Sequence, residues 1–291
     1  MDQNPIVAFY TSHGITTDHH NLDDLSLHFS RREKLYRALG LPPALLSGRT
    51  VLEVGPGRGH NALPMFAWGA NMVFCEPNPS AQMGLHDMLS DYHIDPARWV
   101  LHSKAIEDME TDASFDVIVA EGFLPGLMDR TEVIASMDKL LRPGGVVVTN
   151  CADELSYFFE IVKRMIGRRL LKAGGVENLD EQVALLKSAF SSHFAKLTHA
   201  TRDIADWILD QFLNPAVFGK PFSLIDSTEE FGQQYTLMGS SPNIFTDLSW
   251  YKDLDHDRHG DIRIQFARKR HVLLHMGLEE GLRSAQDNDR L

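Results

Sequence analysis

The chain has 291 residues, of which 43% are hydrophobic and 23% charged, so one large domain can bury its own core without disulfides or metal ions. Its formal net charge of −12 disfavours nucleic acids and anionic membranes as partners, because like charges repel. We expect the two cysteines, Cys75 and Cys151, to be buried free thiols in a reducing cytoplasm. We see no signal peptide and no apolar run of the ~18 residues that span a bilayer.

The first half of the chain alternates short β-branched runs with helical patterns. Residues 1–20 show no regular pattern, and apolar spacing predicts a helix over 22–39 that Gly40 ends. Strands are predicted at 50–54, 71–76, 99–102, 115–120 and 146–150, with helices at 61–68, 80–92 and 131–141, the last capped by Thr131. This alternation predicts an α/β fold, a doubly wound and mostly parallel Rossmann-like sheet covered on both faces.

The pattern changes after Cys151. Residues 152–213 are almost wholly helical in their apolar spacing, which exceeds what one α/β unit needs and predicts an inserted helical cap. A β-like region is predicted at 222–240, followed by a mostly helical segment from Ile262 onward. The predicted organisation is an N-terminal helical segment over 1–48, a Rossmann-like core over 49–151, a helical cap over 152–215, and remaining strands with a C-terminal helical segment over 216–291 that complete the same domain.

A glycine-rich turn follows the first predicted strand. Gly55, Gly57 and Gly59 form the pattern Gly-x-Gly-x-Gly, just after the acid Glu53. In an open parallel sheet this turn lies at the carboxyl edge, where ligands bind, and glycine lets the backbone turn tightly against a ligand. A dinucleotide fingerprint would need a third glycine at position 60, where the chain has His60. An NAD-linked oxidoreductase is therefore the disfavoured enzyme alternative.

Together with three later segments, this turn resembles motif I of the class I S-adenosylmethionine-dependent methyltransferases, of a bacterial small-molecule type. Glu76 ends the second predicted strand, residues 114–122 resemble the family's fourth-strand motif, and residues 140–145 resemble its turn into the fifth strand. The resemblance covers residues 50–151. It implies S-adenosyl-L-methionine as the methyl donor, with Glu53 near its amino group and Glu76 accepting hydrogen bonds from the ribose hydroxyls.

The chain departs from that family after the third predicted strand. Many members carry Gly-Asp-Ala there, and the Asp reaches the adenine amino group, whereas this chain has Ser103-Lys104-Ala105. Lysine cannot accept a hydrogen bond, so we place the adenine beside Ala105 and Ile106 instead. The residues expected to bind the donor are Glu53, Gly55, Pro56, Gly57, Gly59, His60, Asn61, Glu76, Pro77, Asn78, Ala105, Ile106, Glu121 and Gly122.

The sequence says less about the methyl acceptor. Glu121 follows the fourth strand, and two interpretations of it are open. It contacts the acceptor or the sulfonium group of the donor, or it is a solvated glutamate that forms the turn. Trp250 and Tyr251 either line an acceptor pocket or anchor a long connection to the core. The residues predicted to contact the acceptor are His20, Phe123, Trp250 and Tyr251. The basic stretch 163–172 is interpreted as a solvated helix face, and no metal is predicted, because the His-rich stretches at 18–20 and 255–259 lack ligand spacing.

The resulting hypothesis is a cytoplasmic enzyme, a methyltransferase that uses S-adenosyl-L-methionine and a small-molecule acceptor. O-methylation is the first choice and N-methylation the second, with the helical cap excluding water from the reaction. A non-catalytic module that binds S-adenosylmethionine is the remaining alternative. We expect no nucleic-acid or membrane partner, leave a homodimer open, and assign no catalytic base.

Overall fold

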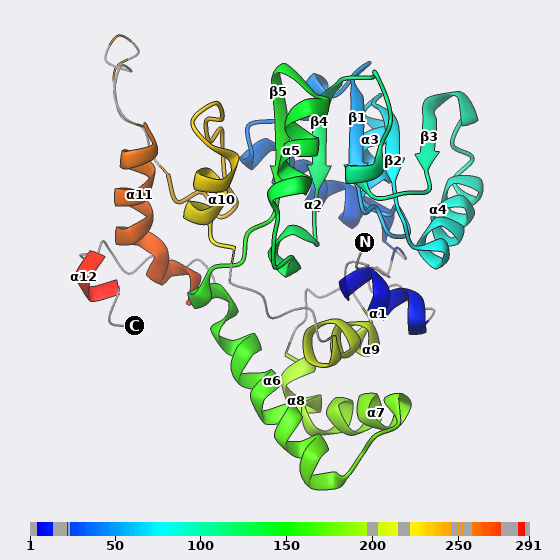
Figure 1. Ribbon diagram of the computed structural model, residues 1–291, viewed down its shortest axis with the longest axis vertical. Helices are drawn as coiled ribbons and strands as arrows, with labels where there is room; N and C mark the ends of the chain where they lie inside the picture. The colour runs from blue at the N-terminus through cyan, green and yellow to red at the C-terminus, as the bar shows by residue number, and fades with distance from the viewer. Residues whose placement is uncertain are drawn as a thin grey trace.

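The computed structural model describes residues 5–13, 22, 24–196, 203–214, 222–245, 250, 252, 258–274 and 285–288. Its centre is a parallel sheet of five strands in the order β3-β2-β1-β4-β5 (Figure 1). The strands are β1 (Thr50–Val54), β2 (Asn71–Cys75), β3 (Trp99–His102), β4 (Phe115–Ala120) and β5 (Leu141–Thr149). The predicted α/β fold class is confirmed, and β5 begins five residues before the predicted start at position 146.

Two hydrophobic cores cover the two faces of this sheet. Alternate residues of a strand point to opposite faces, and accordingly Val51 of β1 belongs to one core and Leu52 to the other. The helices are α2 (Leu25–Ala38), α3 (Ala62–Ala67) and α4 (Pro79–Asp91) on the first face, and α5 (Thr131–Leu140) and α10 (Leu224–Phe231) on the second. Thr131 is the first residue of α5 and not its cap; its backbone N–H donates to Asp129 at 2.9 Å.

A helical cap lies beyond the carboxyl ends of the strands (Figure 1). It contains α6 (Glu154–Gly174), α7 (Leu179–Ala189), α8 (Ser191–Phe194), α9 (Ile204–Ile208) and the π-helical turn η5 (Leu209–Leu213). The buried Arg164 of α6 donates to the carbonyl of Asn214 at 2.6 Å and so satisfies a backbone group at the end of η5. The cap has its own small hydrophobic core, which includes Leu186 and Phe212.

Helix α1 (Pro5–His13) lies between the sheet and the cap (Figure 1). Tyr10 packs against the core on the α5 face of the sheet, while its hydroxyl donates to Asp210 of the cap at 2.6 Å. The N-terminal helix therefore connects the two parts of the molecule at the edge where strands end.

The predicted β-like region at 222–240 is wrong for most of its length. Phe222 makes one isolated antiparallel bridge to Ala152, and the chain then enters α10. Ser223 and Asp226 form a reciprocal capping box at the start of this helix, and that local signal outweighs the β-forming composition of the run. The described residues after α10 form α11 (Arg258–Lys269), η6 (Arg270–Leu273) and α12 (Ala285–Asn288), and they contain no further strand.

Candidate functional site

The glycine-rich turn joins β1 to α3 in left-handed backbone conformations. The φ angles of Gly55, Gly57 and Gly59 are 65°, 56° and 78°, values that favour glycine. At Gly59 glycine is also required by packing, because a Cβ atom there would lie 2.3 Å from Leu85 and 2.5 Å from Met88 of α4. The turn therefore packs closely against α4.

Glu76, directly after β2, holds this turn in place. One of its buried carboxylate oxygens accepts from the Gly57 N–H at 3.2 Å, and the other accepts from the Asn78 N–H at 2.8 Å. The Asn78 side chain in turn caps α4 through the Ser80 N–H. The acid and the turn therefore meet as the resemblance implies, and Pro77 lies between the two residues that fix the loop.

A buried charge cluster lies next to this turn, at the ends of β1 and β4. Glu121 accepts from both terminal nitrogens of Arg32 in α2, at 2.7 and 2.8 Å. Burial alone lowers the pKa of Arg32, but the hydrogen bonds and charge of Glu121 raise it above its ordinary value. Burial, followed by the charge of Glu121, raises the pKa of the neighbouring Tyr36 well above its usual range. Glu53 is also buried and lies within electrostatic reach of Arg32, so the cluster contains two carboxyl groups and one guanidinium.

The loop after β4 closes the same edge of the sheet. The Gly122 N–H donates to the Asn150 side chain at 2.8 Å, which ties the ends of β4 and β5 together. The ring of Phe123 lies 3.9 Å from the place where a Cβ atom on Gly55 would stand. The predicted acceptor residue Phe123 therefore lies beside the predicted donor turn.

The remaining predicted donor residues flank this centre. The carbonyl of His60 accepts from His28 Nε2 at 3.0 Å, and Asn61 precedes α3 without a capping side chain. Ala105 precedes the short 3₁₀ helix η3 (Ile106–Asp108), and Ile106 is buried in the core on the α5 face. The chain after β3 thus presents backbone and apolar groups where we place the adenine.

Of the other predicted acceptor residues, the structure describes Trp250 alone. His20 and Tyr251 lie outside the described residues. Trp250 is 59% exposed, and the Lys252 ammonium lies 4.8 Å from the centre of its ring. The described ranges contain no group of three or more side chains able to hold a metal ion. No helix within these ranges is both long enough and apolar enough to cross a membrane.

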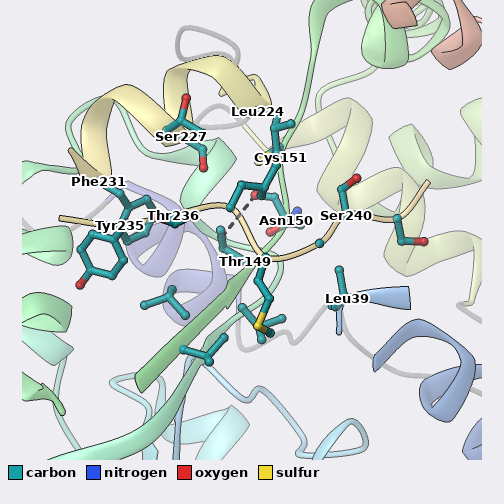
Figure 2. A pocket seen from close by; sticks show the side chains of 18 of the residues that line it. Leu39, Thr149, Asn150, Cys151, Leu224, Ser227, Phe231, Tyr235, Thr236 and Ser240 are labelled. Carbon is teal, nitrogen blue, oxygen red and sulfur yellow. Dashed lines mark hydrogen bonds between the residues drawn. The ribbon is translucent and has the colours of Figure 1, made fainter. Parts of the chain in front are cut away.

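A cavity that the sequence did not predict runs along the outer edge of β5. It measures about 910 Å³ and is bounded by β5, by α10 and by the segment 234–242 (Figure 2). One end of the cavity reaches Glu121 and Asn150. The cavity depends on the position of β5 at the edge of the sheet, where no described strand pairs with its outer side.

The family model decides between the two classes of protein that share these features. A parallel sheet in this strand order, whose first strand leads into a glycine-rich turn held by an acid from the second strand, occurs in dinucleotide-binding proteins as well as in class I S-adenosylmethionine-dependent methyltransferases. The chain belongs to the methyltransferase family, because the family model described as a methyltransferase domain matches residues 27–207. The expected family, and with it S-adenosyl-L-methionine as the cofactor, is thereby confirmed.

Known relatives differ in what they methylate. A stretch of 111 residues is 32% identical to protein arginine N-methyltransferase 6 of Xenopus tropicalis, covering 37% of this chain and 32% of that protein. Another of 133 residues is 29% identical to the ubiquinone biosynthesis O-methyltransferase of Pseudomonas paraeruginosa, covering 44% of this chain and 56% of that protein. The chain thus spans from about a third to just over half the length of these relatives.

Among solved structures, PKMT2 from Rickettsia typhi in complex with AdoHcy has a TM-score of 0.52 and 17% identity, and the match covers 86% of this chain and 49% of that one. At this identity the similarity shows the fold alone. The fold match nevertheless extends beyond the sheet, since it covers most of the chain.

Proposed function

We propose that the protein transfers a methyl group from S-adenosyl-L-methionine to a small-molecule acceptor. The observation that carries the proposal is Glu76, a buried carboxylate whose two oxygens are held by the backbone of Gly57 and Asn78 at the glycine-rich turn. A carboxylate at the end of β2 can accept hydrogen bonds from both ribose hydroxyls of the donor. The carboxyl groups of Glu53 and Glu121, which lie near one guanidinium, suit a donor with an ammonium and a sulfonium group.

In the proposed reaction the acceptor attacks the methyl carbon in line with the carbon–sulfur bond. The new bond forms to an acceptor oxygen or nitrogen, the carbon–sulfur electron pair returns to sulfur, and the acceptor proton leaves to solvent. Because the donor is already activated, the protein mainly orients the partners and excludes water. Tyr36 stays protonated at neutral pH, and Glu121 is engaged by Arg32, so neither is proposed as a base.

We keep O-methylation as the first candidate and N-methylation as the second. Relatives of both kinds support a methyltransferase without choosing between the two acceptors. Incubation with methyl-labelled donor and a panel of catechols and primary amines distinguishes them by the atom that carries the label. A cytoplasmic location is proposed with the function. Sedimentation of the full chain tests the homodimer that the sequence leaves open.

Substitution at the glycine-rich turn tests donor binding. Gly57→Val is expected to weaken S-adenosylmethionine binding about 100-fold or more, equivalent to about 2.7 kcal/mol, because a branched side chain is strained at φ 56° and crowds the turn. Gly48→Val is the matched control. Gly48 also has a positive φ, of 72°, but it lies before β1, at the amino end of the strand and away from the glycine-rich turn. Isothermal titration calorimetry gives both affinities.

Equal affinity of a folded Gly57→Val variant and the unaltered protein would contradict the proposed donor site. Binding of NAD in place of S-adenosylmethionine would favour the oxidoreductase alternative. Donor binding without formation of S-adenosylhomocysteine across the acceptor panel would favour a non-catalytic binding module.

A further inference from the structure

The cavity along β5 has charged side chains only at its two ends. Asp138 and Arg142 lie near the start of β5, while Glu121 and Asp153 lie beyond its end. Each of the four is already engaged within the described chain: Asp138 by Tyr235, Arg142 by Asp116, Glu121 by Arg32 and Asp153 by Arg270. The cavity therefore offers a ligand no charge that lacks a partner.

Between these ends the walls are apolar with a few hydroxyl groups. Leu39 at the end of α2 lines one side, and Leu224 and Phe231 of α10 line another. Figure 2 shows Ser227 and Thr236 among these side chains, with the half-buried Cys151 near the end of β5. At about 910 Å³ the cavity lies at the upper end of the size range of small-molecule sites. Such a lining suits an uncharged ligand with a long apolar portion.

The end of the cavity at Glu121 and Asn150 lies at the carboxyl ends of β4 and β5, on the side of the sheet where we place the donor. Asn150 accepts from the Gly122 N–H, and the next residue along, Phe123, lies beside Gly55 of the glycine-rich turn. A ligand that fills the cavity therefore has one end near the donor and the other about one strand length away.

An extended peptide is a less suitable occupant, although β5 is an edge strand. Pro143 lacks a backbone N–H, and Gly144 and Gly145 follow it, so the strand is a poor template for pairing. In addition, the segment from Tyr235 to Ser240 crosses over the end of β5 near Thr149 and lines the same cavity (Figure 2). This crossing blocks a continuous added strand but leaves room for a narrow flexible chain.

We propose that the cavity along β5 binds the apolar portion of an uncharged, elongated methyl acceptor whose polar head reaches Asn150 and Glu121. The assignment of this ligand as the acceptor rests on the proposed methyltransferase function. Binding of an apolar molecule in the cavity can be tested without turnover.

N-phenyl-1-naphthylamine, an uncharged apolar fluorophore, serves as the probe with the full chain. Its fluorescence is expected to rise saturably with the unaltered protein. Thr236→Trp narrows the cavity from its crossing segment, and its affinity for the probe should fall about tenfold, equivalent to about 1.4 kcal/mol. Val100→Trp adds the same side chain to β3, at the opposite edge of the sheet, where Val100 is exposed. This control should bind the probe as the unaltered protein does.

Cys151 provides a second readout in the unmutated protein. It lines the cavity, whereas the other cysteine, Cys75, is fully buried. Saturating probe, or a linear alcohol of ten carbons, should slow modification of Cys151 by methyl methanethiosulfonate about fivefold, because the reagent then reaches the thiol only while the cavity is empty. Longer alcohols should protect better until the cavity is filled.

Equal probe affinity in Thr236→Trp and Val100→Trp would overturn the proposal. So would a failure of every alcohol to protect Cys151. If alcohols fail, an extended heptapeptide of alternating threonine and valine is tried in their place, and it protects Cys151 if the occupant is a peptide. The last result would assign the cavity to a peptide. Calorimetry with S-adenosylmethionine on the same samples separates the two hypotheses, since a protein that binds the donor but not the probe refutes only this inference.

Discussion

Arg32 and Glu121 are 89 residues apart in the sequence, yet they form an ion pair with two hydrogen bonds, of 2.7 and 2.8 Å. Arg32 has a side chain that is 10% exposed and Glu121 one that is 20% exposed. Two charges at such a position are costly to desolvate, so they are tolerated only together. The pair fixes the loop after β4 against α2, and with it the position of Gly122 and Phe123.

Removing one member of this pair should be more damaging than removing both. Arg32→Met is expected to lower the free energy of unfolding by about 3 kcal/mol, at the low end of the range for a buried pair because Glu121 keeps some solvent contact. The double variant Arg32→Met, Glu121→Gln should recover part of that loss. Urea denaturation measures both.

The exposed pair on the same helix provides the control. Arg37 and Glu33 are neighbours at i,i+4 with side chains 59% and 43% exposed, so Arg37→Met should change the unfolding free energy by about 0.5 kcal/mol or less. If Arg32→Met also lowers the unfolding free energy by only about 0.5 kcal/mol, the buried pair contributes no more to stability than the exposed pair does.

At the scale of elements, the cap is held together by close helix contacts. A Cβ atom on Gly167 of α6 would lie 2.8 Å from the Phe212 ring of η5 and 3.0 Å from Leu186 of α7. The glycine therefore lets three elements meet, although glycine in a helix interior is itself unfavourable by roughly 0.5–1 kcal/mol.

Gly167→Ala tests whether this contact outweighs helix propensity. We expect the substitution to destabilise the protein by about 1–3 kcal/mol, because the added methyl group overpacks the cap core. Gly174→Ala, at the end of the same helix and with its nearest contact at 3.3 Å, should be neutral or slightly stabilising. Thermal unfolding of both variants measures the difference; a gain in stability at Gly167 would mean that the cap core yields easily.

Sequence patterns predicted those parts of the fold that are encoded locally. The strands 99–102 and 115–120 were predicted with the observed bounds, because β-branched runs bounded by turns carry their own signal. The turn and Glu76 were found because their spacing is fixed by one βαβ unit. The partnership of Arg32 with Glu121 and the cavity on β5 depend on contacts between distant segments, which no local pattern contains. At 222–240 the capping box of Ser223 was the decisive signal, and composition alone concealed it.

The whole molecule should lose stability in mild acid. Burial lowers the pKa of His28, and burial followed by the charge of Lys163 lowers that of His193. The folded protein then binds fewer protons than the unfolded chain, so the free energy of unfolding falls as the pH drops below about 6.5, the usual histidine value.

Replacing His28 tests that dependence. His28→Gln keeps a donor for the carbonyl of His60 but cannot titrate, so its unfolding free energy should vary less between pH 7 and pH 5 than that of the unaltered protein. Urea denaturation at several pH values gives the slope. An unchanged slope would show that His28 makes no contribution to the acid response.

The hydrogen bond between Tyr10 and Asp210 joins residues 200 positions apart. During synthesis the ribosome releases Tyr10 long before Asp210 exists, and β1 to β5 with α2 to α5 also precede Asp210 in the chain. The hydrogen bond that joins α1 to the cap therefore forms after all five strands have been synthesised. A nascent chain stopped before position 210 contains every strand of the sheet but lacks this bond between α1 and the cap.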